Sequence, residues 1–295
     1  MTNQVSEAPV SAAAGETLVE KVARRIDGIS TLPHVALRVM EVANNDRAGA
    51  ADLKAVLEGD PALSARVLRS VNSSAYALRT KVTNLQLAIA YLGMKQIRNL
   101  AVTASVSDIF KKDEQVGSYS RAGLWRHLVS VGICARLIAL RQRIPEFEDA
   151  FLAGLLHDIG IILEDQHMHK PFCQMIQSIS PGKTLAESER EHFGFDHTQL
   201  GERVAEHWKF PQAAQAAIAH HHASVGCRGE HAAIVRCVEV ANLICTLKGT
   251  SSVGVNLLRS SRAVLDAMSL SKEDVEVLAA DLDHELELHS NLFTL

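Results

Sequence analysis

The stretch FLAGLLHDIG, residues 151–160, carries the strongest signal for both fold and chemistry in this sequence. An apolar run ends there at an adjacent histidine and aspartate, His157 and Asp158. The pair therefore closes an apolar helix and is expected to face inward. A buried carboxylate without a partner is costly, and a metal ion or an adjacent imidazolium would offset that cost. Gly160 is expected to let the backbone turn sharply after the pair.

The composition around this stretch favours helices packed on helices. Of the 295 residues, 47% are hydrophobic and only 4% are aromatic, and most of the apolar residues are Ala, Leu, Val and Ile. Ala and Leu are strong helix formers. The length allows one large domain or two modest ones with a sizeable core. Because no alternation of apolar and polar residues is long enough to predict a strand, we predict an all-α protein.

The helical patterns divide the chain into two lobes. Residues 1–16 are predicted to be a disordered tail, because they are polar and small and can bury little surface. An N-terminal helical lobe is predicted over residues 17–110 and a second lobe over residues 121–290, with the polar residues 111–120 as the linker between them. The helices expected in the second lobe span residues 121–142, 147–158, 168–179, 184–192, 197–208, 211–222, 231–248, 253–267 and 271–289.

Capping residues mark several of the helix starts. Asp60-Pro61 is a typical start, with the aspartate as N-cap and the proline at the first helical position. Thr83 with Gln86, and Asp196 with Gln199, have the spacing of a capping box. Ser271 precedes two acidic residues in the first turn of the last expected helix.

Histidine is concentrated in the second lobe. The chain has 14 histidines, and ten of them fall between His157 and His231. Neutral imidazole and carboxylate are good ligands for divalent iron, manganese, zinc or magnesium, and no cluster of thiolates competes with them here. On a helix, His220 and His221 would point about 100° apart, which is enough to address two neighbouring metal positions. The residue types therefore suit a divalent metal site.

The first lobe resembles the opening of an HDOD domain in the order and spacing of its motifs. The matching residues are Leu32-Pro33, Asp60-Pro61-Ala62-Leu63, Val67-Leu68, Val71-Asn72-Ser73, Ala75-Tyr76, Ala88-Ile89, Leu92-Gly93 and Ile97-Arg98-Asn99-Leu100. This resemblance implies a bacterial signal-transduction protein that is non-catalytic and acts by binding signalling protein partners.

The second lobe resembles the HD superfamily of metal phosphohydrolases, in which histidines and aspartates on separate helices hold one or two divalent metals. This resemblance implies an HD-like helical fold with Asp158 as the candidate catalytic residue. In such a centre the metals lower the pKa of a bridging water, which then attacks phosphorus. The ligands that the resemblance implies are His127, His157, Asp158, His197, His220, His221 and Asn242.

The chain departs from the catalytic HD pattern at three places. Active HD enzymes have an aspartate ligand where this chain has Asn242, and an amide oxygen is a neutral, weaker ligand. In the related HD-GYP enzymes a lysine follows the HD pair, where Ile161 stands here. Those enzymes also have a glutamate and then Gly-Tyr-Pro after the paired histidines, where this chain has His222 and residues 223–226. These departures count against a cyclic-dinucleotide phosphodiesterase.

Two functions therefore stay open from the sequence. The first is a regulatory HDOD protein, in which His157 and Asp158 could equally be a hydrogen-bonded structural pair inherited from a metal-binding ancestor. The alternative is a metal-dependent phosphohydrolase acting on a nucleotide or cyclic dinucleotide, for which a nucleotide ligand would be expected.

The bulk charge and the ends of the sequence indicate where the protein works. DNA binding is disfavoured by the formal charge of −4, although Arg66, Arg69, Arg79 and Lys81 form a local basic cluster. No targeting run opens the sequence, and no apolar stretch approaches the roughly 20 residues that span a bilayer. The five cysteines form no CxxC pair, and three of them, Cys134, Cys237 and Cys245, lie in apolar helical patterns that suit reduced, buried thiols. We therefore expect a cytoplasmic protein without membrane contact.

Overall fold

The computed structural model describes residues 17–27, 33–45, 47–112, 114–180, 182–254 and 262–294. These residues are almost entirely helical, which confirms the predicted all-α class. The predicted tail at residues 1–16 lies outside the described residues. Leu32 and residues 255–261, which belong to the helix expected at 253–267, also lie outside the described residues.

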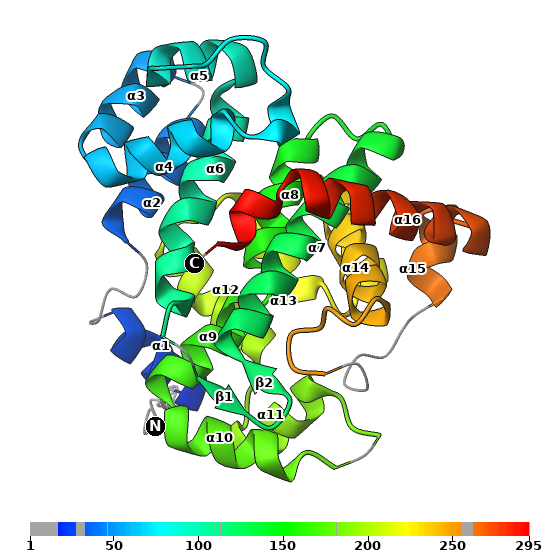
Figure 1. The fold of residues 1–295 in the computed structure, drawn as a ribbon. Helices are drawn as coiled ribbons and strands as arrows, with labels where there is room; N and C mark the ends of the chain where they lie inside the picture. The colour runs from blue at the N-terminus through cyan, green and yellow to red at the C-terminus, as the bar shows by residue number, and fades with distance from the viewer. Residues whose placement is uncertain are drawn as a thin grey trace, which may run out of the picture.

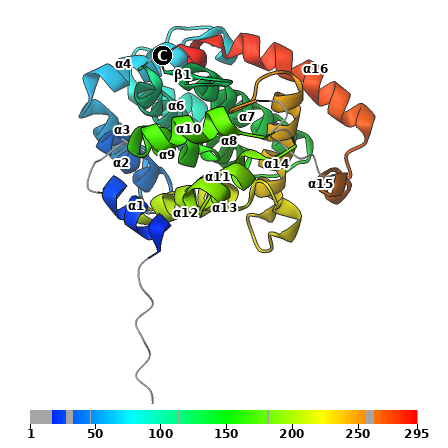
Figure 2. The same ribbon diagram turned by 90° about the horizontal axis from the view of Figure 1, so that it is seen from below.

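The first half of the chain forms a group of short helices, blue to cyan in Figure 1. Its elements are α1 (Leu18–Asp27), α2 (His34–Ala43), α3 (Ala50–Glu58), α4 (Pro61–Val71), the 3₁₀ turn η1 (Ser74–Tyr76), α5 (Leu85–Leu92), α6 (Met94–Val106) and η2 (Ser107–Phe110). Asp60 caps α4 as predicted, because its side chain accepts a hydrogen bond from Leu63 N at 2.9 Å. Helix α1 packs mainly on two helices of the second half, α12 (His197–His207) and α9 (Ile159–His167) (Figure 2).

The second half begins with a short hairpin where the sequence predicted a linker. Strands β1 (Gln115–Val116) and β2 (Tyr119–Ser120) pair antiparallel, and the buried Tyr119 ring packs edge-on against Phe172 with ring centroids 4.9 Å apart. The helical elements that follow are α7 (Arg121–Arg141), α8 (Phe147–Leu156), α9 (Ile159–His167), α10 (His169–Ser178), α11 (Leu185–Phe193), α12 (His197–His207), α13 (Gln212–His220), η3 (Ser224–Gly226), α14 (Ala232–Leu247), α15 (Arg262–Ala267), α16 (Lys272–Leu288) and η5 (Ser290–Phe293).

Helix α9 was missed in the sequence, and its presence changes the setting of the HD pair. Helix α8 ends at Leu156, two residues earlier than expected, and α9 starts at Ile159. His157 and Asp158 therefore occupy a tight corner between two helices. Gly160 lies inside α9 with a negative φ, so the sharp turn expected from it is wrong. The glycine is needed instead because a Cβ there would lie 2.0 Å from the backbone oxygen of His197.

Helices α7 and α8 form the centre of the second half and cross at two glycines (Figure 1). A Cβ on Gly154 would lie 2.8 Å from Val131 O and 2.9 Å from the Cα of Gly132, so the two backbones touch at this point. By length and composition α7 could cross a membrane, which corrects the expectation that no stretch approaches that length. Most of it is buried against α8 and α14, as in the core helix of a globular fold.

A buried polar network joins α6 to the start of α8. The Asn99 amide donates to the backbone oxygen of Glu148 at 2.9 Å and to its Oε2 at 2.7 Å. The guanidinium of Arg98 is fully buried and lies 2.9 Å from Asp149 Oδ1. Since the hydrophobic core also runs continuously through both halves, the two lobes pack as one body.

We expect Gly154→Ala to lower the free energy of unfolding by about 1–3 kcal/mol, because the added methyl must push the backbones of α7 and α8 apart. Urea unfolding followed by circular dichroism measures the change. Gly226→Ala is the matched control, since a Cβ at Gly226 meets no atom within 4 Å. Equal stability of the two variants would show that the crossing is not constrained by this glycine.

Candidate metal centre

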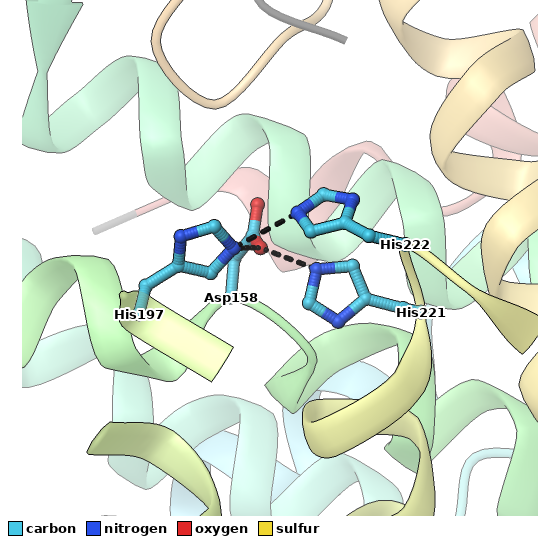
Figure 3. A group of neighbouring side chains, drawn as sticks. All are labelled: Asp158, His197, His221 and His222. Atoms are coloured by element: carbon cyan, nitrogen blue, oxygen red, sulfur yellow. Dashed lines mark hydrogen bonds and ion pairs between the residues drawn. The ribbon is translucent and has the colours of Figure 1, made fainter. Parts of the chain in front are cut away.

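Asp158 lies at the point where several helices of the second half converge. It is 2% exposed and sits in the corner between α8 and α9. The corner is pressed against the first residue of α12, because Gly160 leaves room for the backbone of His197. Figure 3 shows the Asp158 carboxylate facing the rings of His197, His221 and His222, which come from α12 and from the end of α13.

Four buried imidazoles surround this carboxylate. Asp158 Oδ1 lies 3.1 Å from His221 Nε2 and 3.4 Å from His197 Nε2. Asp158 Oδ2 lies 3.2 Å from His157 Nε2 and 3.6 Å from His127 Nε2. All four rings are almost completely buried. The carboxylate therefore has an imidazole nitrogen on every buried side.

The opposite nitrogen of each ring is fixed by an acceptor that points away from Asp158. Each Nδ1 faces a carbonyl or carboxylate oxygen, which can only accept, so each Nδ1 carries a proton. The pairs are His127 with Thr250 O (2.8 Å), His157 with Gly154 O (2.8 Å), His197 with Glu189 Oε2 (2.6 Å) and His221 with Ala217 O (3.0 Å). In their neutral form the rings thus carry the proton on Nδ1 and turn four Nε2 lone pairs toward Asp158. A metal-binding histidine likewise donates its other ring N–H to an acceptor.

Several of the inward-facing atoms are left without a hydrogen bond. Within the described residues, His127 Nε2, His157 Nε2, His221 Nε2 and Asp158 Oδ1 are buried and have no hydrogen-bond partner. Lone pairs facing a carboxylate at these distances repel it unless a proton or a metal ion lies between them. The donor set divides into two candidate metal groups, which share the aspartate: His127, His157 and Asp158; and Asp158, His197, His221 and His222. These residues fit a divalent cation.

The protonation states suit such a cation. Burial alone would raise the pKa of Asp158, but the histidines around it, His157 first, hold this pKa well below its usual value. Burial lowers the pKa of His127 to about 4, and the neighbouring His157 ring adds to the effect. Burial also lowers the pKa of His221, although Asp158 opposes it. The site therefore presents one carboxylate anion together with neutral imidazoles at His127 and His221.

His197 is supported by buried acids that the sequence gave no reason to select. Burial alone would lower the pKa of His197, but Glu189 outweighs it and raises this pKa to about 9. Glu189 also accepts from the backbone N–H of His197 at 3.0 Å. Glu164 is also buried nearby. Its burial, and to a smaller extent the neighbouring Glu189 carboxylate, raise the pKa of Glu164 well above its usual value and favour the protonated form. His197 is therefore protonated at neutral pH in the absence of a metal, and a cation that binds here must displace its Nε2 proton. The carboxylate behind the ring then orients it as a ligand.

The predicted ligands are only partly brought together. His127, His157, Asp158, His197 and His221 meet, whereas His220, the last residue of α13, is exposed and belongs to neither group. In the structure His221 and His222, rather than His220 and His221, lie with Asp158 and His197, and His222 is the exposed member of this group. His221 still follows the helical geometry of α13, because its N–H donates to Ala217 O. His222 Nε2 lies 3.0 Å from His197 Nε2.

Asn242 lines a cavity of about 20 Å³ together with Asp158, His197 and His222. Its Oδ1 accepts a hydrogen bond from Thr246 at 3.3 Å, one turn along α14. The remaining walls are Leu185, Thr246, Ser251, Ser252 and Gly254. A cavity of this size holds about one water molecule.

The sequence matches the model of the HDOD domain family over residues 29–224, and the chain belongs to this family. The match begins after α1 and extends through the rest of the first lobe and the candidate centre up to His222. A curated protein from Treponema pallidum (strain Nichols) is 21% identical over 229 residues. The alignment covers 77% of this chain but 44% of that protein, so the chain spans less than half the length of this relative.

Solved structures agree with the family and the fold. An HDOD domain protein from Geobacter sulfurreducens is 26% identical, with a TM-score of 0.74 over 93% of this chain and 98% of that chain. A protein from Marinobacter aquaeolei VT8 named for signal transduction is 23% identical, with a TM-score of 0.72 over 93% and 63% of the two chains. One from Shewanella amazonensis SB2B, named as a metal-dependent phosphohydrolase, is 20% identical, with a TM-score of 0.60 over 93% and 98%.

We expect His221→Ala to abolish any rise in melting temperature that Mn²⁺ or Zn²⁺ gives to the chelator-treated protein, because it removes a buried ligand nitrogen. Differential scanning fluorimetry with and without each metal measures the response. His220→Ala is the matched control on the adjacent residue, which is exposed and outside the centre. An unchanged response in His221→Ala, or a lost response in His220→Ala, would contradict the ligand assignment.

Proposed function

We propose that this HDOD protein is a non-catalytic regulator that acts by binding a signalling protein, with a divalent metal at the Asp158 centre as a structural element. The observation that carries this proposal is the enclosure of the centre. The carboxylate and the four inward-facing rings are nearly inaccessible, and the described residues beside them leave about 20 Å³. A nucleotide needs a pocket of several hundred Å³.

The chemistry of the walls agrees with a structural role. A divalent ion held by Asp158 and the surrounding histidines would supply positive charge and Lewis acidity at this point. The wall residue Asn242 adds a neutral amide, so it compensates none of that charge. Ile161, which stands where HD-GYP enzymes have lysine, is completely buried and offers no polar group. Among the described residues, the side chains that line this cavity besides Asp158 and the histidines are neutral, namely Leu185, Asn242, Thr246, Ser251 and Ser252.

A metal held here would connect parts of the chain that are far apart in sequence. The ligand residues come from α7, from the corner between α8 and α9, and from the ends of α12 and α13. Because binding free energy to a folded-state site adds to folding stability, metal occupancy would rigidify the second lobe. A rigid lobe would then position the helical surfaces that contact a partner.

Purified protein is therefore expected to bind divalent metal without hydrolysing phosphoesters. Inductively coupled plasma mass spectrometry measures the metal content. Release of phosphate or nitrophenol from monoesters, diesters, nucleotides and cyclic dinucleotides measures turnover of the metal-loaded protein. Turnover that His157→Ala abolishes would overturn the proposal and establish the phosphohydrolase alternative.

Asn242→Asp tests the place of the amide in the cavity wall. We expect the added carboxylate to tighten divalent metal binding by roughly tenfold, since it brings a negative charge next to the ligand set. Competition with a fluorescent chelator measures the affinity. Gln177→Glu, at an exposed position on α10, controls for a general effect of the added charge. Equal affinity of Asn242→Asp and wild type would place the metal out of reach of residue 242.

A further inference from the structure

A second cavity, distant from Asp158 in the fold, is formed by α4, α6 and the C-terminal η5. It has a volume of about 510 Å³. Figures 1 and 2 both show the C-terminal end of the chain beside α4 and α6. The Asn291 amide fixes this end, because it donates to Ser70 Oγ of α4 at 3.1 Å. The size suits a small organic ligand such as a mononucleotide.

Positive charge is concentrated in this cavity. Arg66, Arg69 and Lys111 line it, and none of the described lining residues is acidic. A shallower hollow next to it shares Arg69 and adds Lys81, again without an acidic lining residue. The whole chain has a formal charge of −4, so this local excess of positive charge is opposite in sign to the net charge of the protein. Three of the four residues in the basic cluster seen in the sequence thus face one connected depression.

The cations are held in place to different degrees. Arg66 donates to Ser107 Oγ at 2.5 Å and to both oxygens of Asp108 at 3.1 Å, which fixes its guanidinium plane. Lys111 Nζ lies 2.6 Å from the same Asp108. Arg69 has no acidic or hydrogen-bonding partner among the described residues. Among the described residues, one carboxylate therefore offsets only part of three positive charges, and no acceptor occupies the Arg69 guanidinium.

The rest of the lining combines hydroxyl groups with a small apolar surface. Ser70, Thr103, Ser107 and Thr294 supply the hydroxyls, and Ala62, Ala65, Leu100, Ala104 and Leu292 supply the apolar part. Guanidinium groups recognise phosphate oxygens by paired hydrogen bonds, and an apolar wall can receive the organic part of the same molecule. We propose that this cavity binds a small phosphate ester of mononucleotide size, with Arg66 and Arg69 on the phosphate.

A titration in the presence of EDTA tests this site independently of the metal centre. Isothermal titration calorimetry would compare the four ribonucleoside 5′-monophosphates, inorganic phosphate and the unphosphorylated nucleosides. We expect at least one monophosphate to bind more tightly than its nucleoside. Arg66→Gln and Arg69→Gln should each weaken that binding roughly tenfold, because each removes a charged hydrogen-bond donor.

A control variant shows whether the binding is specific to this cavity. Arg38→Gln removes an exposed arginine of α2 that lies outside the cavity, and it should bind as wild type. Because EDTA is present throughout the titration, failure of the metal centre proposed above leaves this result unchanged. If inorganic phosphate binds as tightly as every monophosphate and shows the same arginine dependence, the ligand is free phosphate and the phosphate chemistry stands.

Three outcomes would overturn the proposal. The first is no binding of any monophosphate or of phosphate by the wild-type protein. The second is unchanged affinity in both arginine variants, or an equal loss of affinity in Arg38→Gln. The third is binding of a single-stranded oligonucleotide, with strong salt dependence, in the absence of mononucleotide binding, which would assign the basic surface to nucleic acid.

Discussion

The fold of the second lobe depends on how one buried carboxylate, Asp158, is compensated. Leaving a carboxylate uncompensated in a protein interior costs several kcal/mol. Hydrogen bonds from backbone amides or hydroxyls, the usual remedy, do not reach Asp158 Oδ1 within the described residues. Four imidazole Nε2 atoms lie around it instead, each ring anchored from behind. A proton or a metal ion among the rings would offset the buried charge, and in the proposed metal-bound form folding and cation binding are linked.

Close backbone packing is what brings the ligands to this point. Gly132 and Gly154 allow α7 and α8 to touch, which sets His127 of α7 opposite the corner that holds Asp158. Gly160 allows the corner to meet the start of α12, which places His197 beside Asp158. In the first turn of α8, Glu148 accepts a hydrogen bond from Asn99 of α6, and Asp149 pairs with Arg98. The first lobe therefore contacts the start of α8, and the corner with Asp158 follows its end.

The sequence predicted those features that depend on local chemistry. The caps at Asp60, Asp196 and Ser271 are confirmed, because each needs only a side-chain oxygen near the following backbone amides. The cap expected at Thr83 is wrong by one residue: Asn84 accepts from Leu87 N instead. His222 was missed because the position of the C-terminus of α13 determines which of the three adjacent histidines point inward. The sequence there contains no glycine or proline that would mark this helix end. Glu189 and Glu164 could not be found, since only tertiary packing buries them beside His197.

The central claim is that a divalent cation lies between Asp158 and the histidines around it. Anomalous diffraction from a crystal grown with Mn²⁺ or Zn²⁺, recorded at the absorption edge of the metal, tests this claim most directly. We predict a peak within bonding distance of Asp158 Oδ1 and of His197 and His221 Nε2. An ordered crystal with no peak there, in which Asp158 is hydrogen-bonded to a protonated histidine, would contradict it.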